Sequence, residues 1–153
     1  MDKPFKAKLV LSAGLIFFIL DRVIKKLLIH QILPNNRVIK YTQNSGIAFG
    51  LNLPEAFLII TTIFLILSLT VWFIRSWQAN NKFEASLFFL ILLGGYSNLI
   101  DRFSYNFVVD YIDLQIWPIF NIADILIVVG VMILIILKVN SPRRDIVERH
   151  HRV

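Results

Sequence analysis

The stretch that decides the fold is residues 119–139, IFNIADILIVVGVMILIILKV. It is almost entirely apolar, and its polar side chains, Asn121, Asp124 and Lys138, lie near its two ends. A helix needs roughly 20 mostly apolar residues to cross the hydrocarbon core of a bilayer. The stretch therefore predicts a transmembrane helix that carries an amide and a carboxylate at one end.

Three further apolar stretches, residues 9–28, 56–77 and 83–100, have a similar character. Hydrophobic residues make up 57% of the 153-residue chain, which is more than an ordinary soluble domain contains. We predict a single α-helical integral membrane domain over residues 1–153, with four transmembrane helices and a basic C-terminal tail at 140–153.

The distribution of charge indicates the orientation in the membrane. The net charge is +6, but the basic residues cluster at the ends of the apolar stretches, which argues against a nucleic-acid partner. The positive-inside rule favours cytoplasmic termini, because the larger basic set then lies inside: Lys3, Lys6, Lys8, Arg75, Lys82, Lys138, Arg143, Arg144, Arg149 and Arg152. The smaller set would lie outside: Arg22, Lys25, Lys26, Arg37, Lys40 and Arg102.

Two connections between the predicted helices have strand-like sequences. Residues 37–42 follow a turn signal at 34–36, and residues 112–116 alternate apolar and polar side chains. Both connections would lie on the outer side, where two strands can satisfy each other's backbone groups. We therefore predict a small extracytoplasmic β-sheet against the membrane surface.

Polar residues interrupt the apolar sequence mainly at the outer helix ends and in the outer connections. An ionisable group within the membrane costs up to about 3 kcal/mol on insertion scales, so such groups are expected to face the bundle interior and to have partners. The four helices would bring one set together at one depth: Asp21, Lys25, Asn44, Asn98, Asp101, Asp110, Asn121 and Asp124.

Several of these residues also have a purely structural interpretation. Asp21 and Lys25 are spaced i, i+4 and fit a salt bridge on one helix face. Asn121 and Asp124 fit a helix N-cap with its acidic N3 partner. The pair Asp101-Arg102 also fits an interfacial charge pair, and residues 44–50 also fit an ordinary turn. Asp110 is different, because it lies in the apolar run 107–112 without a local cation or cap.

With these residues identified, the chain resembles the lipoprotein signal peptidases (signal peptidase II), a family of bacterial membrane aspartic peptidases. Five blocks carry the resemblance in the family's order: DRVIK at 21–25, NSGIAFG at 44–50, GGYSNLIDR at 94–102, VVDY at 108–111 and PIFNIAD at 118–124. The chain departs from the family pattern at Ser97, where Gly is usual, and at Tyr111, where Phe is commoner. The segment between Asp110 and Asp124 is also short.

The resemblance implies that Asp110 and Asp124 are the catalytic pair. It implies supporting or substrate-binding roles for a second set of residues: Asp21, Lys25, Asn44, Gly46, Asn98, Asp101, Arg102 and Asn121. The implied activity is removal of signal peptides from prolipoproteins, immediately before the cysteine that carries a diacylglyceryl group. The resemblance implies the bacterial cytoplasmic (inner) membrane, and the charge pattern places both termini in the cytoplasm and the site near the outer face. We expect a monomer among membrane lipids that needs no cofactor.

Two aspartates hydrolyse a peptide when one is ionised, to take a proton from water, and the other is protonated, to donate one. Asp124 would lie in the first turn of a helix, where the helix dipole favours the anion. The shared proton is therefore expected mostly on Asp110.

Competing chemistries lack the residues they need. The chain has no cysteine, which excludes thiolate nucleophiles and disulfides, and His30, His150 and His151 are placed for neither a Ser–His triad nor a zinc site. We expect no metal. The alternative is a non-enzymatic four-span transporter or helper subunit that binds protons or cations, with Asp110 and Asp124 far apart or on a continuous pore.

Overall fold

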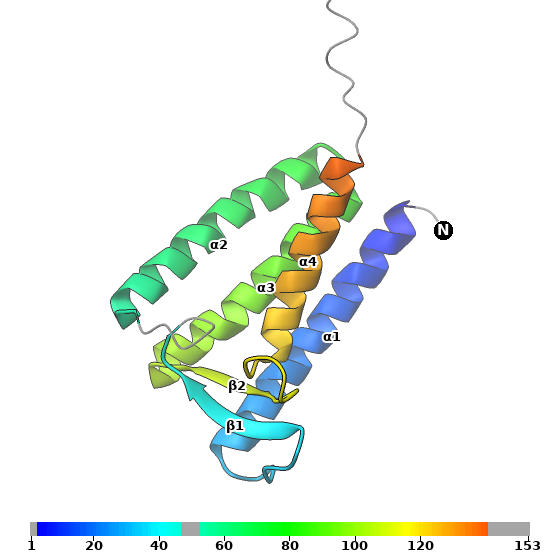
Figure 1. The fold of residues 1–153 in the computed structure, drawn as a ribbon. Coiled ribbons are helices and arrows are strands. Elements are labelled where there is room, and N and C mark those ends of the chain that lie inside the picture. Colours follow the sequence, from blue (N-terminus) through cyan, green and yellow to red (C-terminus); the bar gives the residue numbers. More distant parts are fainter. Residues whose placement is uncertain (1–2, 47–52, 141–153) are drawn as a thin grey trace, which may run out of the picture.

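Four long helices and one small sheet make up residues 3–46 and 53–140, which the computed structural model describes. The helices run side by side, and the sheet lies across one end of them (Figure 1). The first helix begins and the last helix ends at the opposite end (Figure 1). In chain order the elements are α1 (Lys3–Ile29), β1 (Ile39–Asn44), α2 (Glu55–Gln78), α3 (Lys82–Tyr105), β2 (Val108–Ile112) and α4 (Ile122–Val139).

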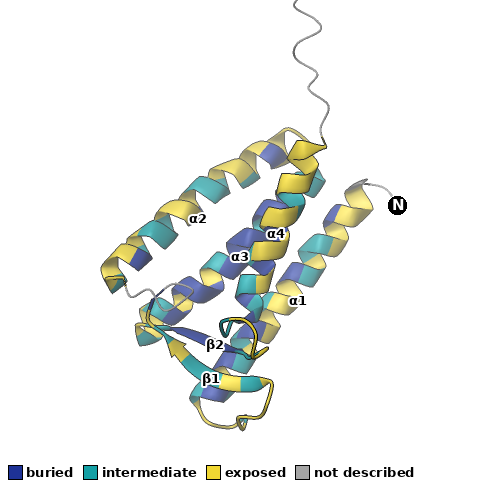
Figure 2. Ribbon diagram, in the orientation of Figure 1, coloured by how far each residue is buried: buried dark blue, intermediate teal, exposed yellow. Residues whose placement is uncertain are grey.

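Helix α3 is the centre of the bundle. It packs against α1, α2, α4 and β2, and most of its side chains are buried, whereas α2 and the outer faces of α1 and α4 are largely exposed (Figure 2). Exposed apolar side chains on three helices are expected where lipid covers the surface. The buried apolar core is therefore formed mainly around α3.

Glycine permits the close approach of α3 and α4. A Cβ atom at Gly94 would lie 2.4 Å from the carbonyl oxygen of Ala123, and one at Gly130 would lie 2.5 Å from Ile91 Cγ1. Real Cβ atoms do not come so close to other atoms. Gly94 therefore allows the first turn of α4 to lie directly against α3, and Gly130 allows the same close approach in the middle of α4.

Three helices, α2, α3 and α4, are long and apolar enough to cross a membrane. Helix α1 is also long, with 27 residues, but charged side chains flank its apolar run from Leu9 to Leu20. At 1.5 Å per residue its length is about 40 Å, which exceeds the hydrocarbon thickness of a bilayer. The predicted fold class, a helical membrane protein with a small sheet, is confirmed.

The sheet consists of β1 and β2 in antiparallel pairing. Thr42 pairs with Asp110 and Asn44 with Val108, and the register shifts between Ile39 and Thr42. The strand predicted at 112–116 is wrong in position, because β2 ends at Ile112 and only the isolated bridge from Ile112 to Phe120 extends the pairing. The strand instead coincides with the apolar run around Asp110.

The helix ends differ from the predicted ranges in three main places. Helix α1 begins at Lys3 rather than residue 9. Helix α4 begins at Ile122 rather than residue 119, because Asn121 caps it with its side chain. Helix α3 continues past Asp101 to Tyr105 and ends where Asn106 adopts a left-handed conformation. Apart from Asn140, the predicted basic tail lies outside the described residues.

Candidate active site

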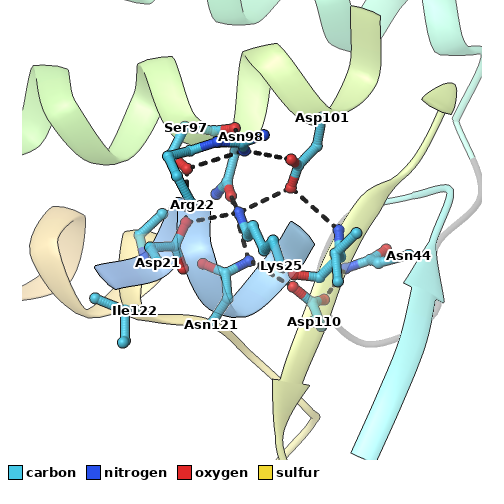
Figure 3. Close-up of polar contacts among 12 residues, drawn as sticks. Asp21, Arg22, Lys25, Asn44, Ser97, Asn98, Asp101, Asp110, Asn121 and Ile122 are labelled. Atoms are coloured by element: carbon cyan, nitrogen blue, oxygen red, sulfur yellow. Dashed lines mark hydrogen bonds and ion pairs between the residues drawn. The ribbon is translucent and has the colours of Figure 1, made fainter. Parts of the chain in front are cut away.

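The polar residues that were predicted to lie at one depth meet where the sheet covers the bundle (Figure 3). They come from α1, α3, β2, the end of β1 and the start of α4, and each buried side-chain nitrogen or oxygen among the described residues has a hydrogen-bond partner. All ten of the predicted site residues lie among the described residues: Asp21, Lys25, Asn44, Gly46, Asn98, Asp101, Arg102, Asp110, Asn121 and Asp124.

One part of this site is a buried ion cluster. Lys25 is fully buried, and its Nζ lies 3.0 Å from Asp21 Oδ2 and 2.8 Å from Asp101 Oδ2. The same ammonium donates to Asn98 Oδ1 at 2.9 Å. The salt bridge predicted from the i, i+4 spacing is confirmed, and the structure adds a second carboxylate to it.

Arg22 completes the ion cluster and was not among the predicted site residues. Its guanidinium pairs with Asp101 Oδ1 and donates to the backbone oxygen of Ser97 at 3.0 Å. Asp101 Oδ2 also accepts from the backbone N–H of Val109 at 3.2 Å, which ties α3 to β2. Asp101 thus forms ion pairs with Arg22 and Lys25 of α1, whereas its sequence neighbour Arg102 donates to a backbone oxygen.

Arg102 reaches the connection after β1. Its Nη2 donates to the backbone oxygen of Gly46 at 3.4 Å. Residues 47–50 of the same sequence block lie outside the described part of the chain. Gly46 itself is buried beside the carboxylates.

Asp110 is held by amides. Its Oδ2 accepts from Asn44 Nδ2 at 2.8 Å and its Oδ1 from Asn121 Nδ2 at 2.6 Å (Figure 3). Asn44 lies in the neighbouring strand, two residues beyond Thr42, which is directly opposite Asp110. A side chain at this diagonal position is within reach of Asp110. Burial raises the pKa of Asp110 to about 6, although the hydrogen bonds from Asn44 and Asn121 act in the opposite direction.

Asp124 forms the capping box that its spacing predicted. Its backbone N–H donates to Asn121 Oδ1 at 2.9 Å, and its Oδ2 accepts from the backbone N–H of Asn121 at 3.2 Å. Its other oxygen accepts from Asn98 Nδ2 at 2.8 Å. Asn121 therefore binds both Asp110 and Asp124, so that one residue contacts both carboxylates.

The two carboxylates open into a common cavity of about 370 Å³. Neither Asp110 nor Asp124 takes part in an ion pair within residues 3–46 and 53–140. The cavity wall is polar around the carboxylates and apolar elsewhere, and includes Asn44, Gly46, Asn98, Arg102, Val108, Trp117, Pro118, Ile119, Phe120, Ile127 and Val128. Two unpaired carboxylates beside such a space suit acid–base chemistry on a bound amide.

Besides Arg22, sequence reasoning missed two side chains in this network. Ser97 Oγ donates to Asp21 Oδ2 at 2.6 Å, and Tyr111 Oη donates to Asp21 Oδ1 at 2.8 Å. Both positions were identified only as departures from a family pattern. Each departure adds a hydroxyl at a buried position, and a buried hydroxyl needs a hydrogen-bond partner. This requirement could have indicated that both side chains belong to the network.

Comparison with known proteins supports what this geometry indicates. A family model described as signal peptidase (SPase) II matches residues 13–140, which is most of the chain. The chain belongs to the signal peptidase II family. The lipoprotein signal peptidase of Syntrophomonas wolfei is 36% identical over 141 residues, which cover 86% of this chain and 93% of the relative. That of Halothermothrix orenii is 32% identical over 130 residues, covering 80% and 89%.

Solved structures agree with the family. A bacterial membrane enzyme solved at 2.3 Å superposes with a TM-score of 0.70 and 29% sequence identity, covering 91% of this chain and 92% of that chain. A second bacterial membrane enzyme gives a TM-score of 0.68 at 27% identity. The predicted membership of the signal peptidase II family, and with it the predicted aspartic peptidase class and prolipoprotein-processing function, is confirmed. The transporter alternative is not favoured.

Proposed function

We propose that this member of the signal peptidase II family cleaves the prolipoprotein signal peptide with Asp110 and Asp124 as its catalytic pair. The observation that supports the assignment is their shared contact with Asn121 beside one cavity, with neither carboxylate neutralised by an ion pair among the described residues. Two carboxylates in this position are able to share a proton, which is what an aspartic peptidase requires.

In the proposed reaction, Asp124 takes a proton from the attacking water while Asp110 donates its proton to the carbonyl oxygen, which gives a tetrahedral diol. Asp124 then passes its proton to the leaving amine, and Asp110 regains one from a diol hydroxyl as the C–N bond breaks. The raised pKa of Asp110 favours its protonated form. Asp124 lies at the third position of α4, where the helix dipole favours the anion. The pair titrates as a unit, so this assignment describes the dominant protonation state of the two carboxylates.

The proposed substrate reaches the site through the lipid. Val128 lines the cavity and is also exposed on the outer face of α4, so the cavity extends to the surface that lipid would cover. A signal helix lying in the bilayer can then present the bond before its diacylglyceryl cysteine to the carboxylates. We further propose a monomer with cytoplasmic termini and the site at the outer face, in agreement with the positive-inside rule.

The proposal is tested with purified protein in lipid bilayers and a diacylglyceryl-modified prolipoprotein. The wild-type chain is expected to release the signal peptide, and Asp124→Ala and Asp110→Ala are each expected to abolish release. Asp113→Asn is the matched control, because Asp113 lies in the same outer connection but faces Lys40 at 3.8 Å instead of the cavity. Full activity in either alanine variant would overturn the assignment.

A further inference from the structure

The buried carboxylate of Asp21 contacts the chain next to both proposed catalytic aspartates. Its Oδ1 accepts from Tyr111 Oη at 2.8 Å and from the backbone N–H of Ala123 at 3.3 Å. Tyr111 directly follows Asp110, and Ala123 directly precedes Asp124. Asp21 Oδ1 therefore links β2 to the first turn of α4, and each of its two contacts is with the residue next to a proposed catalytic aspartate.

The hydroxyl of Tyr111 makes a second contact with α4. It accepts from the backbone N–H of Ile122 at 3.3 Å. Tyr111 points to the opposite face of the strand from Asp110, since side chains alternate along β2. The first backbone N–H groups of a helix have no partner within the helix. Here Tyr111 accepts from the backbone N–H of Ile122, and Asp21 accepts from the backbone N–H of Ala123. Both side chains therefore help to place the start of α4.

Ser97 holds the other oxygen of the same carboxylate. Its hydroxyl donates to Asp21 Oδ2 at 2.6 Å, beside the ammonium of Lys25 at 3.0 Å (Figure 3). Hydrogen bonds to an ionised carboxylate are short and are roughly twice as strong as neutral ones. Ser97 and Tyr111, the two departures from the family pattern, therefore meet on one carboxylate, and neither Gly nor Phe would supply the hydroxyl.

We propose that the hydroxyls of Tyr111 and Ser97 are positioning groups for the catalytic pair, acting through Asp21. They fix the carboxylate that joins β2 to α4, and they thereby fix the separation and relative orientation of Asp110 and Asp124. The inference rests on the proposed catalytic roles of those two residues. Neither hydroxyl touches the reacting atoms.

The protonation state of Tyr111 is compatible with this role. Burial raises the pKa of Tyr111 above its usual range, and the neighbouring Asp21 carboxylate raises it further. The phenol therefore keeps its proton and remains a donor to Asp21 at every pH at which a peptidase assay is run. Its contribution to positioning is expected to be constant across a pH profile.

The first test is Tyr111→Phe, which removes the hydroxyl and keeps the ring. A small displacement of a catalytic group is costly in rate, so we expect kcat to fall about tenfold with KM little changed. Tyr41→Phe is the matched control, since Tyr41 lies in the neighbouring strand and its hydroxyl accepts from Gln43 rather than contacting Asp21. The control is expected to keep the wild-type kcat.

The second readout is the pH dependence of kcat, which a general loss of stability would not alter. Asp110 is influenced by Asp124 from α4, Lys25 from α1 and Arg102 from α3, and all three remain in the variant. If the carboxylates of Asp110 and Asp124 move apart, they repel each other less, and the two apparent pKa values of the profile should move closer together.

Ser97→Ala provides an independent test should Tyr111→Phe fold poorly. It is expected to lower kcat by a few fold, with Ser86→Ala as control, because Ser86 is buried in the same helix but donates to the Phe83 carbonyl. Wild-type kcat and pH profile in both Tyr111→Phe and Ser97→Ala would overturn the inference. An inactive wild type, or an active Asp124→Ala, would instead overturn the proposed function.

Discussion

Two groups of carboxylates lie within one polar network at the same end of the bundle, and they differ in what neutralises them. Asp21 and Asp101 are fully buried and share the ammonium of Lys25, and Arg22 adds a second cation at Asp101. Asp110 and Asp124 receive hydrogen bonds from asparagine side chains and from one backbone N–H, and they line a cavity. We call Asp21 and Asp101 the closed group, because ion pairs hold them, and Asp110 and Asp124 the open pair, because a ligand in the cavity can reach them.

The comparison indicates that one group of carboxylates has a structural role and the other a chemical role. A carboxylate that is paired with a buried cation is held in place by that ion pair and holds its neighbours in place. A carboxylate held by amides keeps its position without an ion pair, as Asp110 and Asp124 do among the described residues. Asn98 and Asn121 join the two groups, because Asn98 binds both Lys25 and Asp124, and Asn121 binds Asn98 and Asp110.

The largest expected effect comes from removing charge in the open pair. Asp124→Asn keeps an acceptor for the backbone N–H of Asn121 but cannot act as a base, so we expect kcat to fall at least about 10³-fold. The free energy of unfolding should change by less than about 1 kcal/mol, since the cap is retained. Signal-peptide release and thermal unfolding in detergent micelles measure the two effects. A large loss of stability with a small loss of rate would assign Asp124 to the structural group.

The reverse result is expected for the closed group. Lys25→Met leaves the carboxylates of Asp21 and Asp101 buried without their shared cation, which should destabilise the fold by about 3–5 kcal/mol. The exposed neighbour provides the control, and Lys26→Met should stay within about 0.5 kcal/mol of wild type. Denaturant unfolding of the purified proteins measures both. An unchanged unfolding midpoint for Lys25→Met would contradict a structural role for the ion cluster.

A smaller effect is expected where α3 and α4 meet beneath both groups. A Cβ atom at Gly94 would lie 2.4 Å from the Ala123 carbonyl oxygen, so Gly94→Ala should push the first turn of α4 away and cost about 1–3 kcal/mol. Gly95→Ala is the matched control, because its Cβ would meet Ile66 at an ordinary 3.5 Å. Equal stability and activity of the two variants would show that this contact does not set the position of Asp124.

The smallest effect concerns the pKa of Asp110. The hydrogen bond from Asn44 lowers this pKa, so Asn44→Ala should raise it further above about 6. The loss of activity at alkaline pH, where Asp110 gives up the proton that it must donate, should then move to higher pH by about one unit, as expected for one charge-assisted hydrogen bond. The pH dependence of kcat/KM measures this shift. Gln43→Ala, an exposed neighbour in β1, should leave the profile unchanged.

The raised pKa of Asp110 also predicts how the free energy of unfolding changes with pH. Because the folded chain binds a proton at Asp110 more tightly than the unfolded chain, the contribution of Asp110 to the free energy of unfolding falls as pH rises from about 3.8 to about 6. Asp110→Asn should remove this part of the pH dependence. Unfolding midpoints of the two proteins at several pH values measure the difference.

Much of the architecture could be predicted because it depends on neighbours along the chain. The apolar run at 56–77 predicted α2, which spans Glu55–Gln78. The spacing of Asp21 with Lys25 and of Asn121 with Asp124 predicted a salt bridge and a cap that are both present. The strand at 112–116 was misplaced, because alternation alone does not show which residues of a connection find a partner strand.

The sequence by itself determined a helical membrane protein with acidic and amide side chains near the helix ends at one end of the bundle, because a helix in lipid must satisfy its own backbone and shield its ionisable groups. Only the tertiary structure decided which carboxylates are neutralised and which remain open. Arg22 and Lys25 reach Asp101 across 79 and 76 positions of sequence, and Tyr111 reaches Asp21 across 90. Such pairings follow from how the helices pack against α3, and spacing along the chain does not encode them.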